Sequence, residues 1–260
     1  MLRVEDVNEG NVDDVFRVCS HSRLDDPLQR EGMEVKRRWL LGMLERHGPC
    51  TKIAYLDDGP VAQVLFYPEA AVPYIAYPRE GVVVVHCVYN PFPKSRGMGV
   101  GTALMEALVD DCRMGIPVLG GGTCSYIVAR PFNTGEGLSM VDFYSRMGFF
   151  DGLNEMYLGV YGSYEAREET RYVPLNEDRG RAVVLYEPLC EYALPHVTRV
   201  KTLLGEVDPD LPVELIDSWE RPEESMKRGN QWLVVNARPI ESYVTDGATF
   251  RAEIEKALRG

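Results

Sequence analysis

The chain has 260 residues, 45% of them hydrophobic, which is enough for a packed core in one large or two modest domains. Its formal net charge of −12 argues against a nucleic-acid partner. No apolar run is long enough to span a bilayer and the N-terminus carries no apolar signal segment, so we expect a cytoplasmic protein with no membrane partner. Six cysteines and four histidines are scattered without C-x-x-C or metal-ligand spacing, which argues against a metal site and a disulfide framework.

The first 160 residues predict a mixed sequence of strands and helices. Apolar residues at 3, 4 and 7 spacing favour helices, and β-branched or alternating runs favour strands. Asp57-Asp58-Gly59-Pro60 is typical of a hairpin turn. The expected strands are 2–7, 51–56, 61–67, 82–88, 117–119 with a resumption at 125–129, and a last one from 149 onward. The expected helices are 11–20, 28–47, 102–113 and 138–147.

Residues 82–105 are the most informative stretch, because a valine-rich strand, a glycine-rich turn and a helix start follow one another. Glycines let a backbone approach a ligand closely, and the unpaired N–H groups of a helix N-terminus attract anions. Lys94 and Arg96 add positive charge at the same place. The stretch therefore predicts a phosphate-binding turn, although neither the dinucleotide G-x-G-x-x-G pattern nor a Walker motif is present.

Arg96, Gly99 and Gly101 fit the R/Q-x-x-G-x-G/A motif of the GNAT acyl-CoA-dependent N-acetyltransferases, which this segment resembles. Residues 143–149, FYSRMGF, resemble the later F-Y-x-x-x-G-F segment of that family, with Gly148 left-handed just past a helix. The resemblance covers roughly residues 1–160 and implies an α/β fold, a mixed sheet with helices on both faces. It also implies acetyl-CoA as co-substrate, direct attack by an amine, no metal, and a homodimer as a plausible assembly.

The resemblance further implies roles for particular residues. The pyrophosphate would lie against the glycine turn, and the pantetheine arm would bind the backbone edge of Val88. Tyr144 would protonate the leaving thiolate; the alternative is a helix residue that packs on Phe143. The expected cofactor-binding residues are Val88, Lys94, Arg96, Gly97, Met98, Gly99, Val100, Gly101 and Thr102.

The sequence offers three candidates for the general base. His86 could deprotonate an amine through water, and the alternative is a hydrogen-bonded core histidine. Glu69 and Glu136 are weaker candidates for the same role. Gly137 stands where the family often has an asparagine, and Asn133 lies four residues earlier, so the segment before the last helix departs from the family's pattern.

Residues 161–180 are polar, without periodicity, and predict a linker. Residues 181–260 predict the β-α-β-α-β-β-α order of a thioredoxin-like α/β domain. The segment from Pro188 to Ala193 resembles a degraded thioredoxin C-P-Y motif, with Cys190 before a helix and Ala193 in place of the second cysteine. The expected strands are 182–186, 213–216, 232–235 and 240–244, and the expected helices are 191–205, 222–228 and 249–258.

An acetyltransferase-like domain followed by such a domain resembles the YoaP-like group of N-acetyltransferases, and Thr249-Phe250-Arg251 in the last helix adds to this. The favoured function is acetyl transfer from acetyl-CoA to an amine of unidentified kind. The alternative is a non-catalytic acyl-CoA-binding or sensing protein. In that alternative Cys190 would be a single-thiol sensor or part of a docking surface, whereas a buried structural cysteine is its simpler interpretation.

Overall fold

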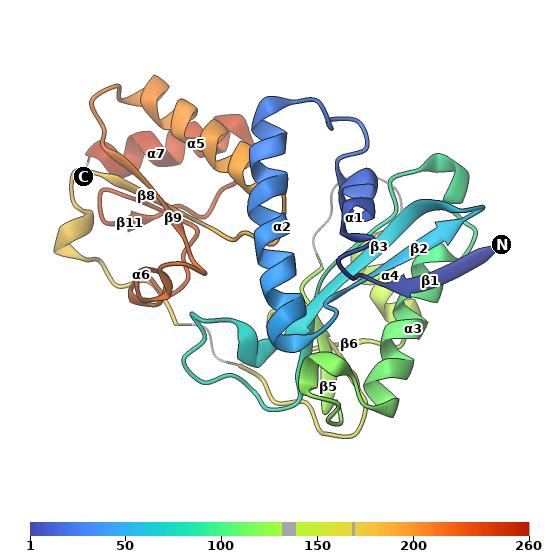
Figure 1. Ribbon diagram of the computed structural model, residues 1–260. Coiled ribbons are helices and arrows are strands. Elements are labelled where there is room, and N and C mark those ends of the chain that lie inside the picture. Colours follow the sequence, from blue (N-terminus) through green and yellow to red (C-terminus); the bar gives the residue numbers. More distant parts are fainter. Residues whose placement is uncertain (132–138, 168–169, 260) are drawn as a thin grey trace. The chain divides into compact units, whose positions relative to one another are not determined.

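The computed structural model describes residues 1–131, 139–167 and 170–259 (Figure 1). The chain forms two compact units, which are described separately. Unit 1 comprises Met1–Leu24, Arg37–Val72 and Tyr77–Glu168, and unit 2 comprises Asp25–Lys36, Pro73–Ala76 and Glu169–Gly260. No helix in the described part of the chain is long and apolar enough to cross a membrane.

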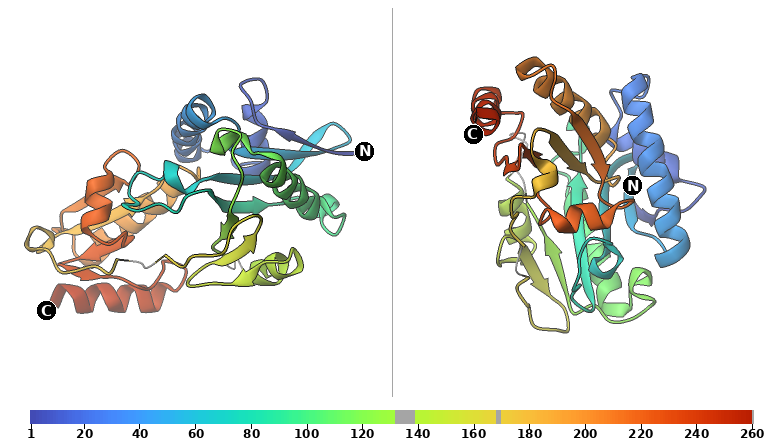
Figure 2. Two further views of the ribbon diagram at one scale, coloured as in Figure 1. Left: turned by 90° about the horizontal axis from the view of Figure 1, so that it is seen from below. Right: turned by 90° about the vertical axis from the view of Figure 1, so that its left-hand side faces the viewer.

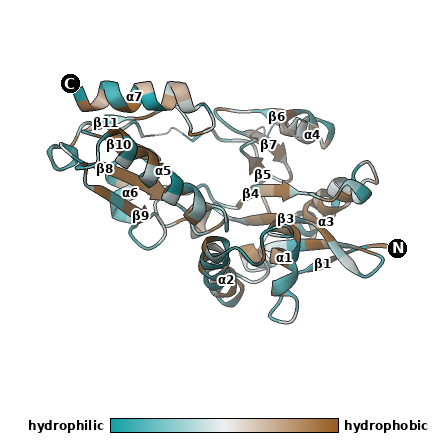
Figure 3. Cartoon of the chain, turned by 90° about the horizontal axis from the view of Figure 1, so that it is seen from above, coloured by the Kyte–Doolittle hydropathy of each residue, from teal (hydrophilic) through white to brown (hydrophobic). Residues whose placement is uncertain are grey.

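Unit 1 is built on a seven-stranded sheet with the order β1-β2-β3-β4-β5-β7-β6. The pairs are antiparallel except for β4 and β5, which are parallel. The central strands of this sheet are rich in buried hydrophobic residues (Figure 3). They are β1 (Leu2–Asp6), β2 (Thr51–Leu56), β3 (Gly59–Pro68), β4 (Val82–Tyr89), β5 (Tyr126–Ala129), β6 (Phe150–Asp151) and β7 (Met156–Gly159).

The helices of unit 1 lie on both faces of this sheet. α1 and α2 cover one face and α3 covers the other (Figure 2). α3 buries an apolar stripe that faces the sheet. It comprises Leu104, Leu108 and Cys112, which are four residues apart, and Met105 beside them. The helices are α1 (Val12–Cys19), α2 (Pro27–His47, of which unit 1 includes the part from Arg37), α3 (Val100–Met114) and α4 (Met140–Arg146).

The predicted order of elements over residues 1–160 is confirmed, with two differences in detail. Pro117–Leu119 is a short 3-10 helix and not a strand, closed by the N–H of Leu119 on the carbonyl of Ile116 at 3.0 Å. Pro117 lacks the N–H that a strand ladder needs, which explains the difference. The expected strand from residue 149 is two strands, β6 and β7, separated by a turn in which Asn154 has a positive φ of 58°.

Unit 2 contains a four-stranded sheet with the order β11-β10-β8-β9, in which β8 and β9 are parallel and the other pairs antiparallel. α5 and α7 lie on one face and α6 on the other (Figure 1). The predicted order β-α-β-α-β-β-α is therefore confirmed. The elements are β8 (Ala182–Tyr186), α5 (Ala193–Val207), β9 (Val213–Asp217), α6 (Pro222–Lys227), β10 (Leu233–Val235), β11 (Arg238–Pro239) and α7 (Gly247–Arg259).

The last hairpin of unit 2 is tighter than predicted. Its second strand is Arg238–Pro239, so the prediction of a strand at residues 240–244 was wrong. Asn236 and Ala237 have φ values of 47° and 58°, so two residues suffice to reverse the chain. Val235 consequently pairs with Arg238.

A buried ion cluster joins the segment before β8 to α6. Arg228 and Asp178 are both fully buried, and the guanidinium Nη2 lies 2.6 Å from the Asp178 carboxylate. Arg228 also binds Glu224 one helical turn earlier, at 2.7 Å. Residues 161–180, predicted as a linker, thus include a residue in the core of unit 2.

This cluster predicts that unit 2 loses stability in acid. Hydrogen bonds from Arg228 and Lys227 lower the pKa of Glu224 from 4.5 to about 2. Burial alone would raise the pKa of Asp178, but hydrogen bonds from Arg228 and Tyr172 outweigh it and lower that pKa. A carboxylate whose pKa is lower in the folded state stabilises the fold above its unfolded pKa. We therefore expect the melting temperature to fall between about pH 4.5 and about pH 2. Asp178→Asn should melt lower at neutral pH and depend less on pH in this range.

Candidate functional site

β4 is paired on both sides only over its first half. Val82–Val85 pair with Tyr126–Ala129 of β5, whereas Cys87–Tyr89 are paired in the described chain with β3 alone. The register to β3 shifts between Leu65 and Phe66, which face Cys87 and Val85, so that His86 is an extra residue in a β-bulge. Val88, which is half-buried, therefore lies where the described sheet has a local edge, as expected.

The glycine turn after β4 is open to solvent. Gly97 and Gly99 both have φ of 74°, and a Cβ atom built on either would have no neighbour within 4 Å. The conformation thus requires glycine for backbone reasons and not because of packing. Arg96, Gly97, Met98 and Gly99 are all exposed.

Helix α3 begins directly after this turn, with Gly99 as its N-cap. Its first hydrogen bond runs from the N–H of Ala103 to the carbonyl of Gly99 at 2.9 Å. Helix geometry leaves the N–H groups of Val100, Gly101 and Thr102 without an intrahelical acceptor. These groups and the helix dipole favour an anion at this end of α3.

Lys94 and Arg96 bring positive charge to the turn. The Lys94 ammonium lies 5.9 Å from the centre of the Phe92 ring, and Arg96 Nη2 donates to the carbonyl of Pro91 at 3.2 Å. Both side chains are exposed. They can therefore approach a phosphate without leaving a buried site.

A hydrogen-bonded clamp, which the sequence did not suggest, holds the turn together. Ser95 is fully buried, and its Oγ donates to Asn90 Oδ1 at 2.6 Å. The Asn90 amide in turn donates to the carbonyl of Ser95 at 3.3 Å. The clamp joins the two ends of residues 90–95 and thereby fixes the position from which Arg96 and Gly97 continue the chain.

The strand edge, the turn and α4 meet at Gly101. A Cβ atom at Gly101 would lie 3.3 Å from the Phe143 ring and 3.9 Å from Val88 Cγ1. A side chain at this position would thus press on α4, which carries Tyr144. The structure therefore brings Val88, the glycine turn and the tyrosine-bearing helix into one place.

Tyr144 is almost completely buried, with 2% of its surface exposed. Its ring packs at 5.4 Å from that of Phe143 and at 5.1 Å from that of Phe149. Burial raises the pKa of Tyr144, and the nearby Cys87 thiol raises it further. The phenol is therefore protonated at neutral pH and able to donate a proton. Gly148, just past α4, has the expected left-handed φ, 86°.

The two described candidates for the general base differ in their surroundings. His86 is half-buried at the bulge, with its ring 6.1 Å from that of Tyr67. Glu69 is almost fully buried and accepts hydrogen bonds from Arg79 and Arg167, so it has no free capacity to act as a base. Glu136 lies outside the described residues, as do Asn133 and Gly137.

Glu69 belongs to a buried cluster of charges centred on Arg79. The Arg79 guanidinium lies 2.7 Å from Glu69 and also binds Glu155, and Arg167 lies 2.9 Å from Glu69. Burial opposes the charge on Glu69, but the Arg79 hydrogen bonds outweigh it and lower its pKa. The same bonds raise the pKa of Arg79. The arginines and glutamates of this cluster neutralise one another, so its role is structural.

Cys190 lies between β8 and α5, as predicted from its motif. It is half-buried, and its carbonyl accepts the N–H of Ala193 at 2.9 Å, where α5 begins. The next residue, Glu191, is buried and binds the buried Lys36 at 2.9 Å. The backbone of Gly32 lies so close to Glu191 that a Cβ there would be 2.1 Å from the Glu191 carbonyl oxygen. Residues of α2 that belong to unit 2 thus hold this loop.

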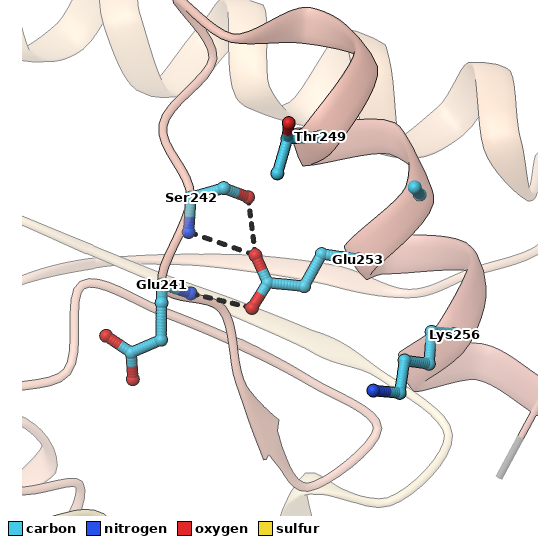
Figure 4. Close-up of a pocket in the computed structure, with 6 residues that line it drawn as sticks. Glu241, Ser242, Thr249, Glu253 and Lys256 are labelled. Atoms are coloured by element: carbon cyan, nitrogen blue, oxygen red, sulfur yellow. Dashed lines mark hydrogen bonds between the residues drawn. The ribbon is translucent and has the colours of Figure 1, made fainter.

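A shallow pocket in unit 2 lies along α7 and contains none of the predicted site residues (Figure 4). The Glu253 carboxylate accepts the N–H of Glu241 at 3.0 Å and that of Ser242 at 2.9 Å. These bonds lower the pKa of Glu253 although burial opposes the charge. The carboxylate serves to fix the segment before α7.

No cluster of three or more potential metal ligands occurs among the described residues. Neither a protein-family model nor a curated protein matches the sequence. Solved structures that resemble part of this chain include Ard1 from Thermoplasma volcanium, at 13% identity and a TM-score of 0.42, covering 61% of this chain and 97% of that one. The ribosomal-protein-S18-alanine N-acetyltransferase from Escherichia coli is 10% identical at a TM-score of 0.42, covering 65% and 99%.

A GNAT family acetyltransferase from Brucella melitensis, in complex with acetyl-CoA, is 14% identical at a TM-score of 0.41, covering 64% of this chain and 92% of that one. Identities and TM-scores as low as these assign no activity to the chain.

Proposed function

We propose that the chain transfers the acetyl group of acetyl-CoA to an amine. The observation that carries the proposal is the departure of β4 from β5 after Val85, immediately before an exposed glycine turn and the N-terminus of α3. A strand edge at Val88 suits the amide groups of a pantetheine arm. A helix N-terminus with Arg96 beside it suits a pyrophosphate.

The reaction would need little from the protein beyond positioning and proton transfer. The amine nitrogen attacks the thioester carbonyl carbon, and the C–S bond breaks as the amide forms. The proton lost by the amine passes through water to His86, which is our candidate base. Tyr144 donates a proton to the CoA thiolate, since its phenol is protonated at neutral pH, although its raised pKa makes it a weaker acid than a free tyrosine.

We further propose the domain boundaries 1–160, 161–180 and 181–260, with a thioredoxin-like last domain of the YoaP-like kind. The strand order β11-β10-β8-β9 and the place of Cys190 before α5 support this proposal. Ala193 stands where a second cysteine would be needed, so a two-cysteine redox cycle within this domain is not part of the proposal. Homodimer formation stays a prediction.

Titration of acetyl-CoA into the purified chain by calorimetry tests the proposed function. We expect roughly micromolar binding, weakened at least about 100-fold by Gly99→Asp, since each tenfold loss corresponds to about 1.4 kcal/mol. The new carboxylate would repel the pyrophosphate at the α3 N-terminus. Arg96→Ala should also weaken binding.

Two variants of unit 1 serve as matched controls. Gly120 has a φ of 65° and open space around its Cβ position, so Gly120→Asp introduces the same charge and similar backbone strain away from the turn. Arg113→Ala removes an exposed arginine at the opposite end of α3. Both should bind acetyl-CoA like the wild type. Absence of binding by the wild type would refute the proposal.

A further inference from the structure

Two of the six cysteines lie side by side in unit 1, although they do not form a C-x-x-C pair in the sequence. Cys112 is in the last turn of α3, and Cys124 precedes β5. The N–H of Cys124 donates to the carbonyl of Cys112 at 3.4 Å. A direct backbone hydrogen bond is compatible with the Cα separation of about 4.4–6.8 Å that a disulfide needs.

The side chains of this pair also face each other. The two thiols share a hydrogen bond, which raises the pKa of Cys112 and lowers that of Cys124. The Cys124 thiol also lies 3.3 Å from the carbonyl oxygen of Tyr126. Both residues are fully buried, so neither thiol is exposed to bulk water.

We propose that Cys112 and Cys124 are a redox-modification site that a peroxide converts to an intramolecular disulfide. The Cys124 thiolate attacks one peroxide oxygen, and the O–O bond breaks to give a sulfenic acid and hydroxide. The Cys112 thiol then attacks the Cys124 sulfur, and water leaves as the S–S bond forms. In sum, two thiols and one hydrogen peroxide give one disulfide and two waters, with the protein oxidised and the peroxide reduced.

The segment between the two cysteines explains how a buried pair can react. It contains Gly115, Gly120, Gly121 and Gly122, of which the first three have positive φ. Glycine-rich surface segments open locally at low free-energy cost, and a peroxide is small enough to enter through such an opening. The bond would then tie the C-terminal end of α3 to the start of β5.

Oxidation of the full-length chain, followed by alkylation and peptide mapping, tests the proposal. After treatment of the reduced protein with a few equivalents of hydrogen peroxide and denaturation, we expect the number of alkylatable thiols to fall from six to four. Trypsin cleaves after Arg96, Arg113 and Arg146, so the two cysteines fall into different peptides, 97–113 and 114–146. A disulfide would join these two peptides, and reduction would separate them.

The outcomes distinguish this pair from the other cysteines. Cys112→Ala and Cys124→Ala should keep all five remaining thiols, whereas Cys50→Ala, which removes another buried cysteine, should still lose two. The wild-type peptide map does not depend on the stability of any variant. Six alkylatable thiols after treatment, a cross-link between other cysteines, or sulfonic acid without a cross-link would each overturn the proposal. None of these results depends on acetyl-CoA binding.

Discussion

Tyr144→Phe is expected to lower kcat for acetyl transfer by about 10²–10⁴-fold, the range that general acid–base catalysis contributes. The substitution removes one hydroxyl from a ring that is buried between Phe143 and Phe149, so the packing remains. The leaving thiolate would then take its proton from water. KM for acetyl-CoA should change little, because the hydroxyl acts on the leaving group and not on the phosphates.

Steady-state kinetics with a reactive amine would measure this effect once an acceptor is found. Tyr161→Phe is a suitable control because the Tyr161 hydroxyl donates to the carbonyl of Arg113, on the exposed surface. It should leave both constants unchanged. An unchanged kcat in Tyr144→Phe would show that the tyrosine is a packing residue, even if acetyl-CoA binding is intact.

Arg79→Met is expected to lower the free energy of unfolding of unit 1 by about 3–5 kcal/mol, the cost of removing one partner from a buried ion pair. The Arg79 side chain is 7% exposed, and those of Glu69 and Glu155 are 1% and 3% exposed. Without the guanidinium, the two buried carboxylates would keep, among the described side chains, only Arg167 and the Tyr164 hydroxyl as partners. Urea unfolding would measure the loss.

A charge-neutral background provides the test of mechanism. In a Glu69→Gln/Glu155→Gln variant, Arg79→Met should cost much less than in the wild type, because no buried carboxylate is left unpaired. Arg3→Met should leave stability nearly unchanged, since Arg3 and its partners Glu5 and Asp58 are exposed. Equal losses for Arg79→Met in both backgrounds would point to lost packing and not to charge.

The sequence predicted the elements well where local chemistry decides them. The hairpin at Asp57-Asp58 forms with φ values of 49° and 67°, and β2 and β8 have the predicted bounds. The strand predicted at 117–119 was wrong because a proline removed the donor that a strand needs. The second strand of the last hairpin was misplaced because a two-residue turn reverses the chain earlier than expected.

The candidate site could be predicted in part. The glycine turn, Val88 and Tyr144 were each found from the sequence, and the structure brings them together around Gly101. The bulge at His86 and the clamp between Asn90 and Ser95 depend on pairing with β3 and on backbone carbonyls. Such contacts leave no periodic signal, and neither does the approach of Cys112 to Cys124 across a glycine-rich segment.

Among the described strands, the second half of β4 pairs with β3 alone, and a strand at the edge of a sheet carries a hazard. The edge of a sheet can pair with any other extended chain, including another copy of the same protein. Two features confine this hazard: the edge is short, and Pro91 and Pro93 follow directly and cannot extend a ladder. The prolines before the glycine turn therefore limit self-association along this part of β4.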